Sequence, residues 1–316
     1  MNNIRQSGKA RVSVGLPVYN GEHFLAAAID SVLAQTFQDF EIVISDNASS
    51  DSTQKICLEY AAADPRVKYH RNDQNIGGVK NFNRVFELSS AELFMWFADD
   101  DVIAPTYLEK CIAVLDRDPS VILSFSSFGD IDAEGKLIDT RRSSLVMDAP
   151  DPVSRFRHAI RMEHLCEPWC AVTRTEVLRK TPLYGIFADY DRVLLAELGL
   201  HGRFYEVPEF LFFHREHEHR SINLYPGRYE RMAWIDPKRV GKVTLPHLRQ
   251  FREYLAAIGR ARLPLGQKLK CYGAMSGWFW KNLSRINTDM EIALRELVRP
   301  IWSRFHRQPN ASKISP

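Results

Sequence analysis

Short runs of β-forming residues alternate with helical patterns over the first hundred residues of this chain. The runs begin at Val12, Phe40, Val67 and Leu93, and segments with apolar residues at helical spacing separate them. Strands that alternate with helices are typical of βαβ units, whose strands lie parallel in one sheet. The sequence therefore predicts an α/β fold, Rossmann-like, with a mainly parallel sheet and flanking helices.

The pattern also predicts where the elements lie. We expect strands over 12–16, 40–45, 67–70 and 121–125, and another that ends just before Asp99. We expect helices over about 22–35, 78–88, 153–163 and 192–198, and one that opens at 51–53. Pro17 should end the first strand, and from about residue 230 onward the chain has a helical pattern.

Three polar loops follow the predicted strands. They are Pro17-Val18-Tyr19-Asn20, Asp46-Asn47-Ala48-Ser49 and Asp99-Asp100-Asp101. Ligands of open α/β sheets bind beyond the carboxyl ends of the strands, so these loops should converge on one cleft.

The three adjacent carboxylates of Asp99, Asp100 and Asp101 repel one another unless a cation lies among them. Mg²⁺ and Mn²⁺ prefer carboxylate oxygens, and Mg²⁺ is usually held by one or two carboxylates together with substrate phosphates. The triplet therefore suggests a metal-diphosphate site. A helix begins just after Pro105, so one of these carboxylates could instead cap its N-terminus.

The first turn excludes two common ways of binding phosphate. It has neither the G-x-G-x-x-G of dinucleotide-binding folds nor the G-x-x-x-x-G-K-[ST] of a P-loop. A diphosphate would then depend on the metal. This agrees with the aspartate triplet.

Composition is that of a soluble globular protein, with 45% hydrophobic and 26% charged residues. No apolar run reaches the roughly 18 residues of a spanning helix, and the N-terminus lacks a secretory apolar region. The five cysteines are odd in number and irregularly spaced, which fits a reducing compartment. We therefore expect a cytoplasmic protein.

Charge is unevenly divided. Residues 228–316 carry 18 Lys and Arg against 6 Asp and Glu, a net charge of +12, whereas residues 1–227 carry 24 against 33, a net charge of −9. A helical apolar stripe runs from Leu294 to Phe305 among arginines, although Pro300 should kink it. Residues 265–307 thus suggest peripheral contact with the inner face of a membrane, with a core or homodimer contact as the alternative. We expect no nucleic-acid partner.

Several ordered motifs closely resemble the opening of family 2 glycosyltransferases. They are residues 12–20 (VSVGLPVYN), 29–37 (IDSVLAQTF) and 42–51 (IVISDNASSD), followed by Asn75-Ile76-Gly77, Asn83 and the triplet. These are inverting enzymes with the GT-A fold. The resemblance implies a GT-A catalytic domain over 1–227, with a nucleotide-sugar half at about 11–128 and an acceptor half at 129–227. Residues 228–316 would form a helical C-terminal extension.

The resemblance also implies roles in the nucleotide pocket. Tyr19 would offer its ring to the base, and Asp46 would accept a hydrogen bond from the N3–H of uridine or thymidine. Tyr19 as a core-edge aromatic and Asp46 in an Asx turn with Ser49 are the alternatives. The expected nucleotide-binding residues are Pro17, Val18, Tyr19, Asn20, Asp46, Asn47, Asn75, Lys80, Asn83, Asp99 and Asp100.

The family's D-x-D pattern often has a first acid where this chain has Ala98. The resemblance therefore assigns the Mn²⁺ or Mg²⁺ ligand to Asp101, with Asp99 or Asp100 at the ribose or the ion's water shell. Further along, His217 could complete the metal shell and Arg215 could pair with the diphosphate. Residues 214–220 could equally be a solvated flap.

The general base of the family is an Asp in a Glu-Asp-aromatic segment. Ala188 replaces the Glu, Asp189 matches the base, and Asp191 is the alternative base or a cap for the following helix. The predicted activity is inverting transfer of a sugar from a UDP- or dTDP-sugar to a hydroxyl of a glycan or lipid-linked acceptor, in cell-surface polysaccharide synthesis. The alternatives are a non-catalytic nucleotide-sugar-binding subunit and a sugar nucleotidyltransferase, which would need a basic, glycine-rich first turn.

Overall fold

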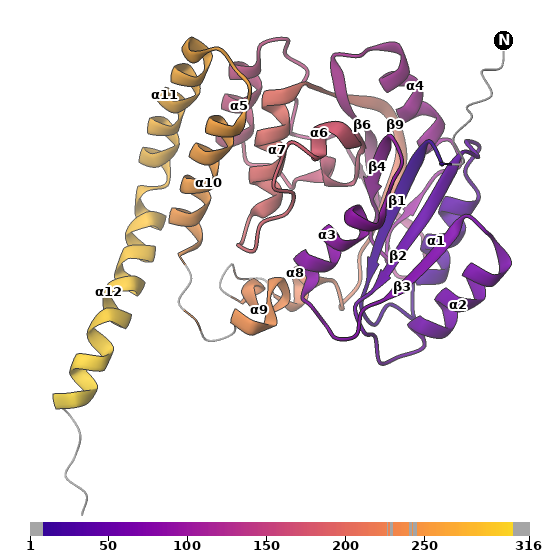
Figure 1. Cartoon of the computed structure of the whole chain (residues 1–316), viewed down its shortest axis with the longest axis horizontal. Coiled ribbons are helices and arrows are strands. Elements are labelled where there is room, and N and C mark those ends of the chain that lie inside the picture. Colours follow the sequence, from indigo (N-terminus) through magenta and orange to yellow (C-terminus); the bar gives the residue numbers. More distant parts are fainter. Residues whose placement is uncertain (1–8, 226, 228–229, 240–241, 243–244, 306–316) are drawn as a thin grey trace, which may run out of the picture.

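A nine-stranded mixed sheet forms the centre of the molecule in the computed structural model (Figure 1). The structure describes residues 9–225, 227, 230–239, 242 and 245–305, without the side chains of residues 233, 239 and 296–305. The strands are β1 (Val12–Val18), β2 (Phe40–Asp46), β3 (Val67–Arg71), β4 (Leu93–Trp96), β5 (Val102–Ile103), β6 (Val121–Ile131), β7 (Leu137–Arg141), β8 (Val172–Arg174) and β9 (Arg203–Arg215). Their order is β3-β2-β1-β4-β8-β6-β9-β5, and β7 pairs with β6.

The sheet is mostly parallel. Strands β1 to β4 pair in parallel, as do β6 and β9, whereas β8 is antiparallel to both β4 and β6. Every residue of β1 and β2 is buried. Burial on both faces requires helices on both sides of the sheet, which is typical of parallel α/β folds. The predicted fold class is confirmed.

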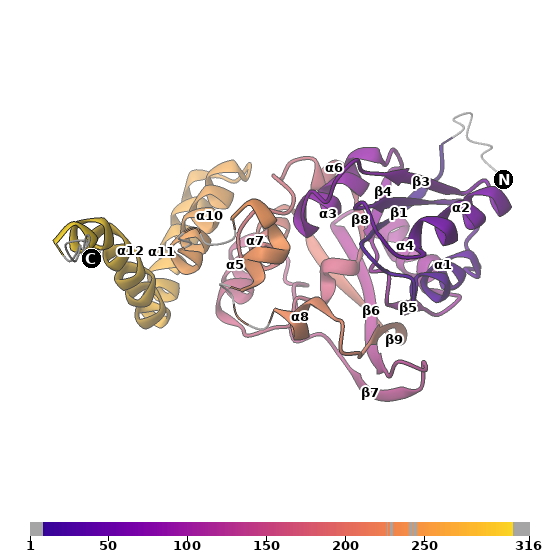
Figure 2. The ribbon, with the colours of Figure 1, turned by 90° about the horizontal axis from the view of Figure 1, so that it is seen from below.

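The helices of the strand-helix alternation are α1 (Leu25–Leu33), α2 (Thr53–Ala63), α3 (Gly78–Leu88) and α4 (Tyr107–Arg117). Right-handed crossovers place α1 and α2 on one face of the sheet and α3 on the other, because β4 lies on the opposite side of β1 from β2 (Figure 2). The remaining helices are α5 (Pro152–Arg161), α6 (Thr175–Leu178), α7 (Tyr190–His201), α8 (Ser221–Leu224), α9 (Arg231–Ile235), α10 (Pro246–Arg260), α11 (Leu265–Lys281) and α12 (Leu283–Phe305).

Two local predictions were wrong. Pro17 does not end β1, which continues to Val18 with Pro17 opposite Ser45 of β2. Its missing N–H costs nothing there, because β4 pairs with β1 only as far as Gly15. Asp191 does not cap the helix near residue 192, since α7 begins at Tyr190 and its N-cap is Asp189.

The helices after residue 245 lie at the end of the molecule remote from β1 to β3 (Figures 1 and 2). Arg260 of α10 donates two hydrogen bonds, at 2.9 and 2.7 Å, to the buried Glu197 carboxylate of α7. Asp289 of α12 accepts the backbone N–H groups of His247 and Leu248, at 2.8 and 3.0 Å, and so caps α10. Among the described residues, no helix is long and apolar enough to span a bilayer.

Candidate functional site

Three loops at the carboxyl ends of β1, β2 and β4 come together as expected. The backbone N–H of Asn20 donates to Ser49 Oγ at 2.9 Å, and that of Gly21 donates to Thr53 Oγ1 at 2.9 Å. A Cβ added to Gly21 would lie 2.3 Å from a carboxylate oxygen of Asp99. The triplet therefore begins directly against the first turn.

Pro17 and Val18 are buried, so they contribute their backbone to this turn. The Val18 carbonyl accepts the N–H of Asn47 at 2.8 Å. Tyr19 is 51% exposed, which excludes a core position and leaves its ring free to meet a ligand. Asn20 has a φ of 54°, a left-handed conformation that Asn tolerates better than most residues.

Asp46 is fully buried and its two carboxylate oxygens are both engaged. One accepts the Ser49 N–H at 2.8 Å, which is the Asx turn foreseen as an alternative. The other accepts the Tyr69 hydroxyl at 2.7 Å and the Arg71 guanidinium at 2.6 Å. Burial by itself would raise the pKa of Asp46, but the hydrogen bonds from Ser49, Tyr69 and Arg71 outweigh it and lower that pKa.

Arg71 is the more exposed partner of the Asp46–Arg71 pair. Its guanidinium also donates to the Ser49 carbonyl at 2.9 Å, so it lies over the second loop. Sequence reasoning missed Arg71 and Tyr69. The alternation of side chains along β3 could have indicated them. Residues 69 and 71 lie on the same face of this strand, and Arg71 pairs in register with Asp46.

A network of asparagines holds the neighbouring loop. Asn47 Nδ2 donates to Asn75 Oδ1 at 3.0 Å, and Asn47 Oδ1 accepts the Ile76 N–H at 2.9 Å. Asn81, buried on α3, donates to the Ser45 carbonyl at 2.8 Å and accepts the Ser45 hydroxyl at 2.7 Å. Asn47 and Asn75 thus shape the site through its backbone, and Asn81 is a further residue that the sequence reasoning missed.

Helix α9 packs on the start of α3, a contact that the sequence did not predict. Gly77 has a φ of 91°, and an added Cβ would lie 2.6 Å from the Ile235 carbonyl. At Gly78 an added Cβ would lie 2.5 Å from the Trp234 ring. Lys80, an expected nucleotide ligand, lies 3.7 Å from the carboxylate of Asp236 and so helps to hold this segment.

Asn83, an expected nucleotide ligand, is bonded to the backbone of Tyr184. Its Nδ2 donates to the Tyr184 carbonyl at 2.9 Å, and its Oδ1 accepts the Tyr184 N–H at 3.1 Å. Both polar ends of the amide are therefore used on one residue of the loop that leads to Asp189. Asn83 positions that loop, and this geometry does not favour direct nucleotide contact.

The triplet is tied to the end of β9. Asp101 is buried, and its carboxylate lies 3.1 Å from His214 Nδ1 and accepts the Arg215 N–H at 3.1 Å. Asp100 lies 3.0 Å from His217 Nε2. His214 was not foreseen as a partner. The structure thus brings the expected metal residues Asp101 and His217 to the same end of β9.

The surroundings of Asp99 fit a cation. Loss of hydration, together with the neighbouring carboxylates of Asp100 and Asp101, raises the pKa of Asp99 well above its ordinary value. Nδ1 of His217 is buried and makes no hydrogen bond to any described residue, so it is a candidate nitrogen ligand. No group of three or more His, Cys, Asp and Glu in the described part of the chain is already arranged around a metal. One or two protein ligands with phosphate oxygens would suffice for Mg²⁺.

Arg215, expected at the diphosphate, is buried and bonded to the backbone. Its guanidinium donates to the carbonyls of Asp100, Asp132 and Ala133 at 3.0, 3.1 and 2.9 Å, and it lies 4.9 Å from the centre of the Phe24 ring. It joins the β6–β7 turn to the triplet. This geometry favours a structural role over the predicted pairing with phosphate.

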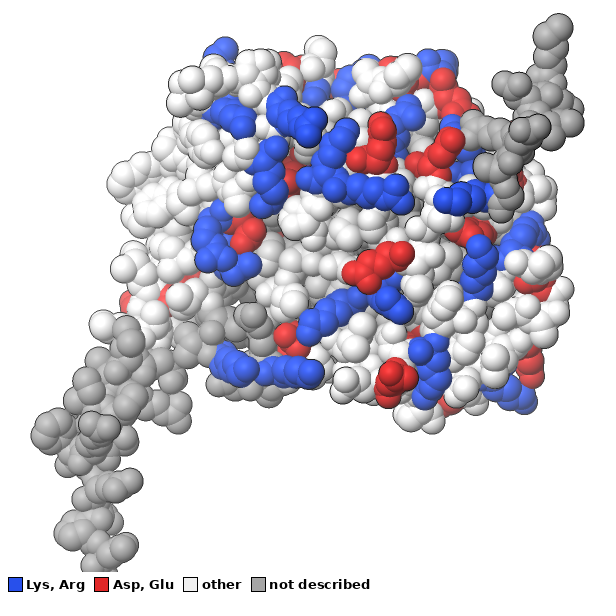
Figure 3. Space-filling model, viewed as in Figure 1, with Lys and Arg blue, Asp and Glu red and all other residues white. Residues whose placement is uncertain are grey.

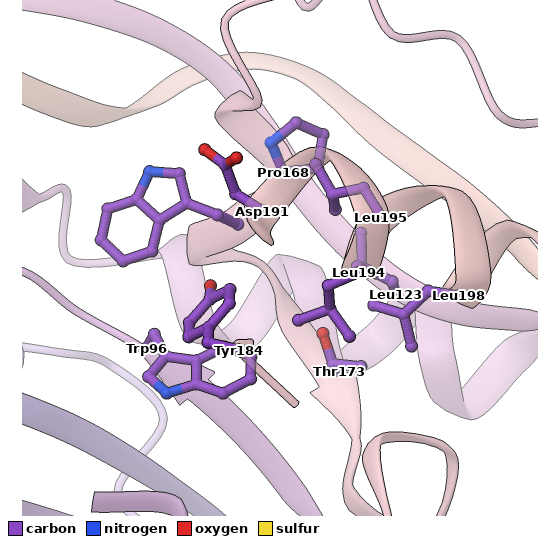
Figure 4. Close-up of a pocket in the computed structure, with 10 residues that line it drawn as sticks. Trp96, Leu123, Pro168, Thr173, Tyr184, Asp191, Leu194, Leu195 and Leu198 are labelled. Atoms are coloured by element: carbon purple, nitrogen blue, oxygen red, sulfur yellow. The ribbon is translucent and has the colours of Figure 1, made fainter. Parts of the chain in front are cut away.

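The two candidate bases lie at the start of α7. Asp189 has a φ of 62° and is partly buried. Asp191 lies in the first turn, where its carboxylate accepts the Arg192 N–H at 2.8 Å and faces a small pocket (Figure 4). The pocket is lined by the rings of Trp96, Trp169 and Tyr184 and by leucines of α7. Of the two candidate bases, Asp191 thus lines this aromatic pocket.

Comparisons with known proteins settle the family. The model of the family described as Glycosyl transferase family 2 matches residues 13–181, which is more than half of the chain. The chain belongs to glycosyl transferase family 2. The recognised motifs lie within the matched segment, whereas Asp189, Asp191, Arg215 and His217 lie beyond it.

Curated relatives match over shorter stretches. An uncharacterized glycosyltransferase of Rickettsia typhi is 30% identical over 141 residues, 44% of this chain and 41% of that protein. The chondroitin synthase of Escherichia coli is 30% identical over 128 residues, 40% of this chain and 18% of that protein. The matched segment therefore spans less than half of either relative.

Two solved structures show the same fold. The S. aureus TarS 1–349 complex with UDP-GlcNAc has a TM-score of 0.56 at 16% identity and covers 85% of this chain and 80% of that one. The mannosyltransferase PcManGT of Pyrobaculum calidifontis, in complex with GDP-Man and Mn²⁺, has a TM-score of 0.51 at 16% identity and covers 92% and 88%. The family 2 chain thus has the GT-A fold predicted for it.

Proposed function

We propose that this family 2 protein transfers a sugar from a nucleoside diphosphate donor to a hydroxyl of a glycan or lipid-linked acceptor in polysaccharide synthesis. The observation that carries the proposal is the meeting of the Tyr19 and Asp46 loops with the aspartate triplet, Asp99 lying against Gly21. Chondroitin synthase among the relatives and the UDP-GlcNAc complex of TarS support this class of reaction.

The side chains around Asp46 favour a uridine or thymidine donor. Tyr19 offers an exposed ring to the base, and Arg71 offers guanidinium N–H groups to a pyrimidine carbonyl. Asp46 orients Arg71, and it would meet the base N3–H itself once Arg71 moves aside, since both its oxygens are now engaged. PcManGT binds GDP-Man, so the choice of base needs a direct test.

Asp99, together with Asp100 or with Nδ1 of His217, would hold Mn²⁺ or Mg²⁺. Asp101, which was expected to be the main ligand, would instead fix the loop, because its two carboxylate oxygens contact His214 and the Arg215 N–H. When bound, the ion would neutralise the charge that develops on the departing diphosphate. Chelation by EDTA should then lower donor affinity, and added Mn²⁺ should restore it.

Asp189 would take the proton of the acceptor hydroxyl as its oxygen bonds to the anomeric carbon and the bond to the diphosphate breaks. A single displacement of this kind inverts the anomeric configuration. Asp191 is the competing base, because its carboxylate faces the aromatic pocket.

The test measures nucleoside diphosphate release and sugar transfer with UDP-, dTDP- and GDP-sugars in the presence of Mn²⁺. Asp189→Asn should lower the transfer rate by about 10²–10⁴-fold and leave UDP affinity in calorimetry nearly unchanged. Asp191→Asn is the matched control, and a large loss there alone would transfer the role of base to Asp191.

A non-catalytic nucleotide-sugar-binding subunit remains the second candidate, because Ala98 and Ala188 stand where family members often have acids. A subunit of this kind would bind a sugar nucleotide in calorimetry but would release no nucleoside diphosphate. That result would refute the transferase proposal while leaving the donor site intact.

A further inference from the structure

Helix α11 has an apolar outer face. Its inner face buries Cys271, Ala274, Met275 and Trp278, which lie against the rest of the protein. On the opposite face, Leu265, Leu269 and Trp280 are 72%, 59% and 70% exposed. An added Cβ would meet no atom within 4 Å at Gly266 or Gly273, so nothing described rests on this side of the helix. Apolar residues this exposed on one face mark an interaction surface.

The charged residues of the helix itself are all lysines, of which Lys268 also donates to the Gly259 carbonyl at 2.8 Å and Lys281 lies near Glu163. The segment from Leu265 to Lys281 contains Lys268, Lys270 and Lys281 and no Asp or Glu. The helical wheel puts Lys268 on one border of the exposed face and Lys270 and Lys281 on the other, because successive residues differ by about 100°. The edge of the molecule over α11 is mainly white in Figure 3, with blue side chains beside it.

The exposed face of α11 points outward and ends near the start of α7. The helix lies at the left outer edge of the molecule in Figure 1. At its C-terminal end, Lys281 donates to the Arg161 carbonyl at 2.9 Å and lies 3.7 Å from the Glu163 carboxylate. Arg192, the residue after Asp191, lies 3.8 Å from the same carboxylate. The face therefore ends beside the start of α7, where exposed Met162 and Leu165 extend the apolar surface.

Charge decides between the two occupants that suit an apolar face. A second copy packed on α11 would bring lysines against lysines, with no acid on the helix to pair with them. An anionic bilayer attracts each lysine near its surface and accepts Trp280 and the leucines at the boundary between headgroups and acyl chains.

We propose that the outer face of α11 docks on an anionic membrane, where it brings the start of α7 to a lipid-linked acceptor. Membrane binding depends only on this surface, whereas the delivery of a lipid-linked acceptor rests on the proposed transferase function. Docking through this face narrows the membrane contact expected for residues 265–307 to one described helix face, since the stripe from Leu294 to Phe305 lies largely on side chains that the structure does not describe.

The test is co-sedimentation of the full chain with vesicles of phosphatidylcholine alone and with about one-third phosphatidylglycerol. Binding should require the anionic lipid and weaken with salt. The affinity of the double variant Leu269→Glu and Trp280→Glu for these vesicles should be at least about tenfold lower than that of the wild type. Leu58→Glu, at an exposed leucine on α2, is the matched control and should bind as the wild type does.

Two further measurements separate the possible failures. Nucleoside diphosphate release with a water-soluble acceptor should be the same in the double variant and the wild type, so loss of vesicle binding there reports the surface and not the active site. Wild-type binding by the double variant would overturn the proposal. Sedimentation of the wild type as a dimer that the double variant dissociates would overturn it in favour of self-association.

Discussion

His164 should make this protein less stable as the pH falls below 6.5. Its ring is buried, and its Nδ1 accepts the Cys166 N–H at 3.2 Å, which needs a neutral imidazole. Burial, followed by the charge of Arg192, lowers the pKa of His164 to about 4. The Ala159 carbonyl and the Glu163 carboxylate oppose this decrease, while His158 adds slightly to it.

The magnitude follows from the two protonation equilibria. The unfolded chain takes up the proton near pH 6.5 and the folded chain only near pH 4, so folding is fully favoured above pH 6.5 and loses free energy between these values. A pKa lowered from 6.5 to about 4 corresponds to about 3 kcal/mol. About 2 kcal/mol of this should be lost between pH 7 and pH 5.

The assay compares urea unfolding of the wild type and His164→Asn at pH 7 and pH 5. The Asn side-chain oxygen can still accept the Cys166 N–H, but it does not titrate. The variant should therefore lose about 2 kcal/mol less than the wild type between the two pH values. His23→Asn, at an exposed histidine, should keep the wild-type dependence. Equal losses in the wild type and His164→Asn would refute the assignment.

Two other substitutions test how the segment of the candidate base is held. Asn83→Ala should lower the transfer rate about tenfold and leave UDP affinity in calorimetry unchanged, because it removes both hydrogen bonds to Tyr184. A large loss of UDP affinity would instead support the predicted nucleotide contact. Glu197→Gln should lower the free energy of unfolding in urea by about 1–3 kcal/mol, since Glu197 is buried against Arg260. Glu59→Gln, at an exposed ion pair with Lys55, should change it by about 0.5 kcal/mol or less.

The fold could be predicted because its signals are local. The periodicity over 78–88 gives α3 with its exact bounds, since an amphipathic face and flanking breakers fall within one window. The extent of β1 could not be predicted in this way. Whether Pro17 lacks a needed hydrogen bond depends on where β4 stops, and that is a property of the assembled sheet.

The site was predictable at the level of loops and less so at the level of side chains. Motifs located the loops of Tyr19, Asp46 and the triplet, but the partners of Asp46 come from β3 and those of Asp101 from β9. Asn83 was expected at the nucleotide and Arg215 at the diphosphate, and in the structure both side chains are bonded to backbone groups. A polar residue in a motif shows that a hydrogen bond is needed there, and only the packing shows with which atom.

The ion pair between Glu197 and Arg260 has a geometric consequence. Glu197 lies eight residues after Asp189 on α7, about 12 Å along the helix axis. The pair fastens α7 to α10, and α10 is capped in turn by Asp289 of α12. The candidate base is therefore held at a fixed distance from the C-terminal helices. With α11 docked on a membrane as proposed, the protein would select acceptors whose hydroxyl group lies at the matching distance from the membrane surface.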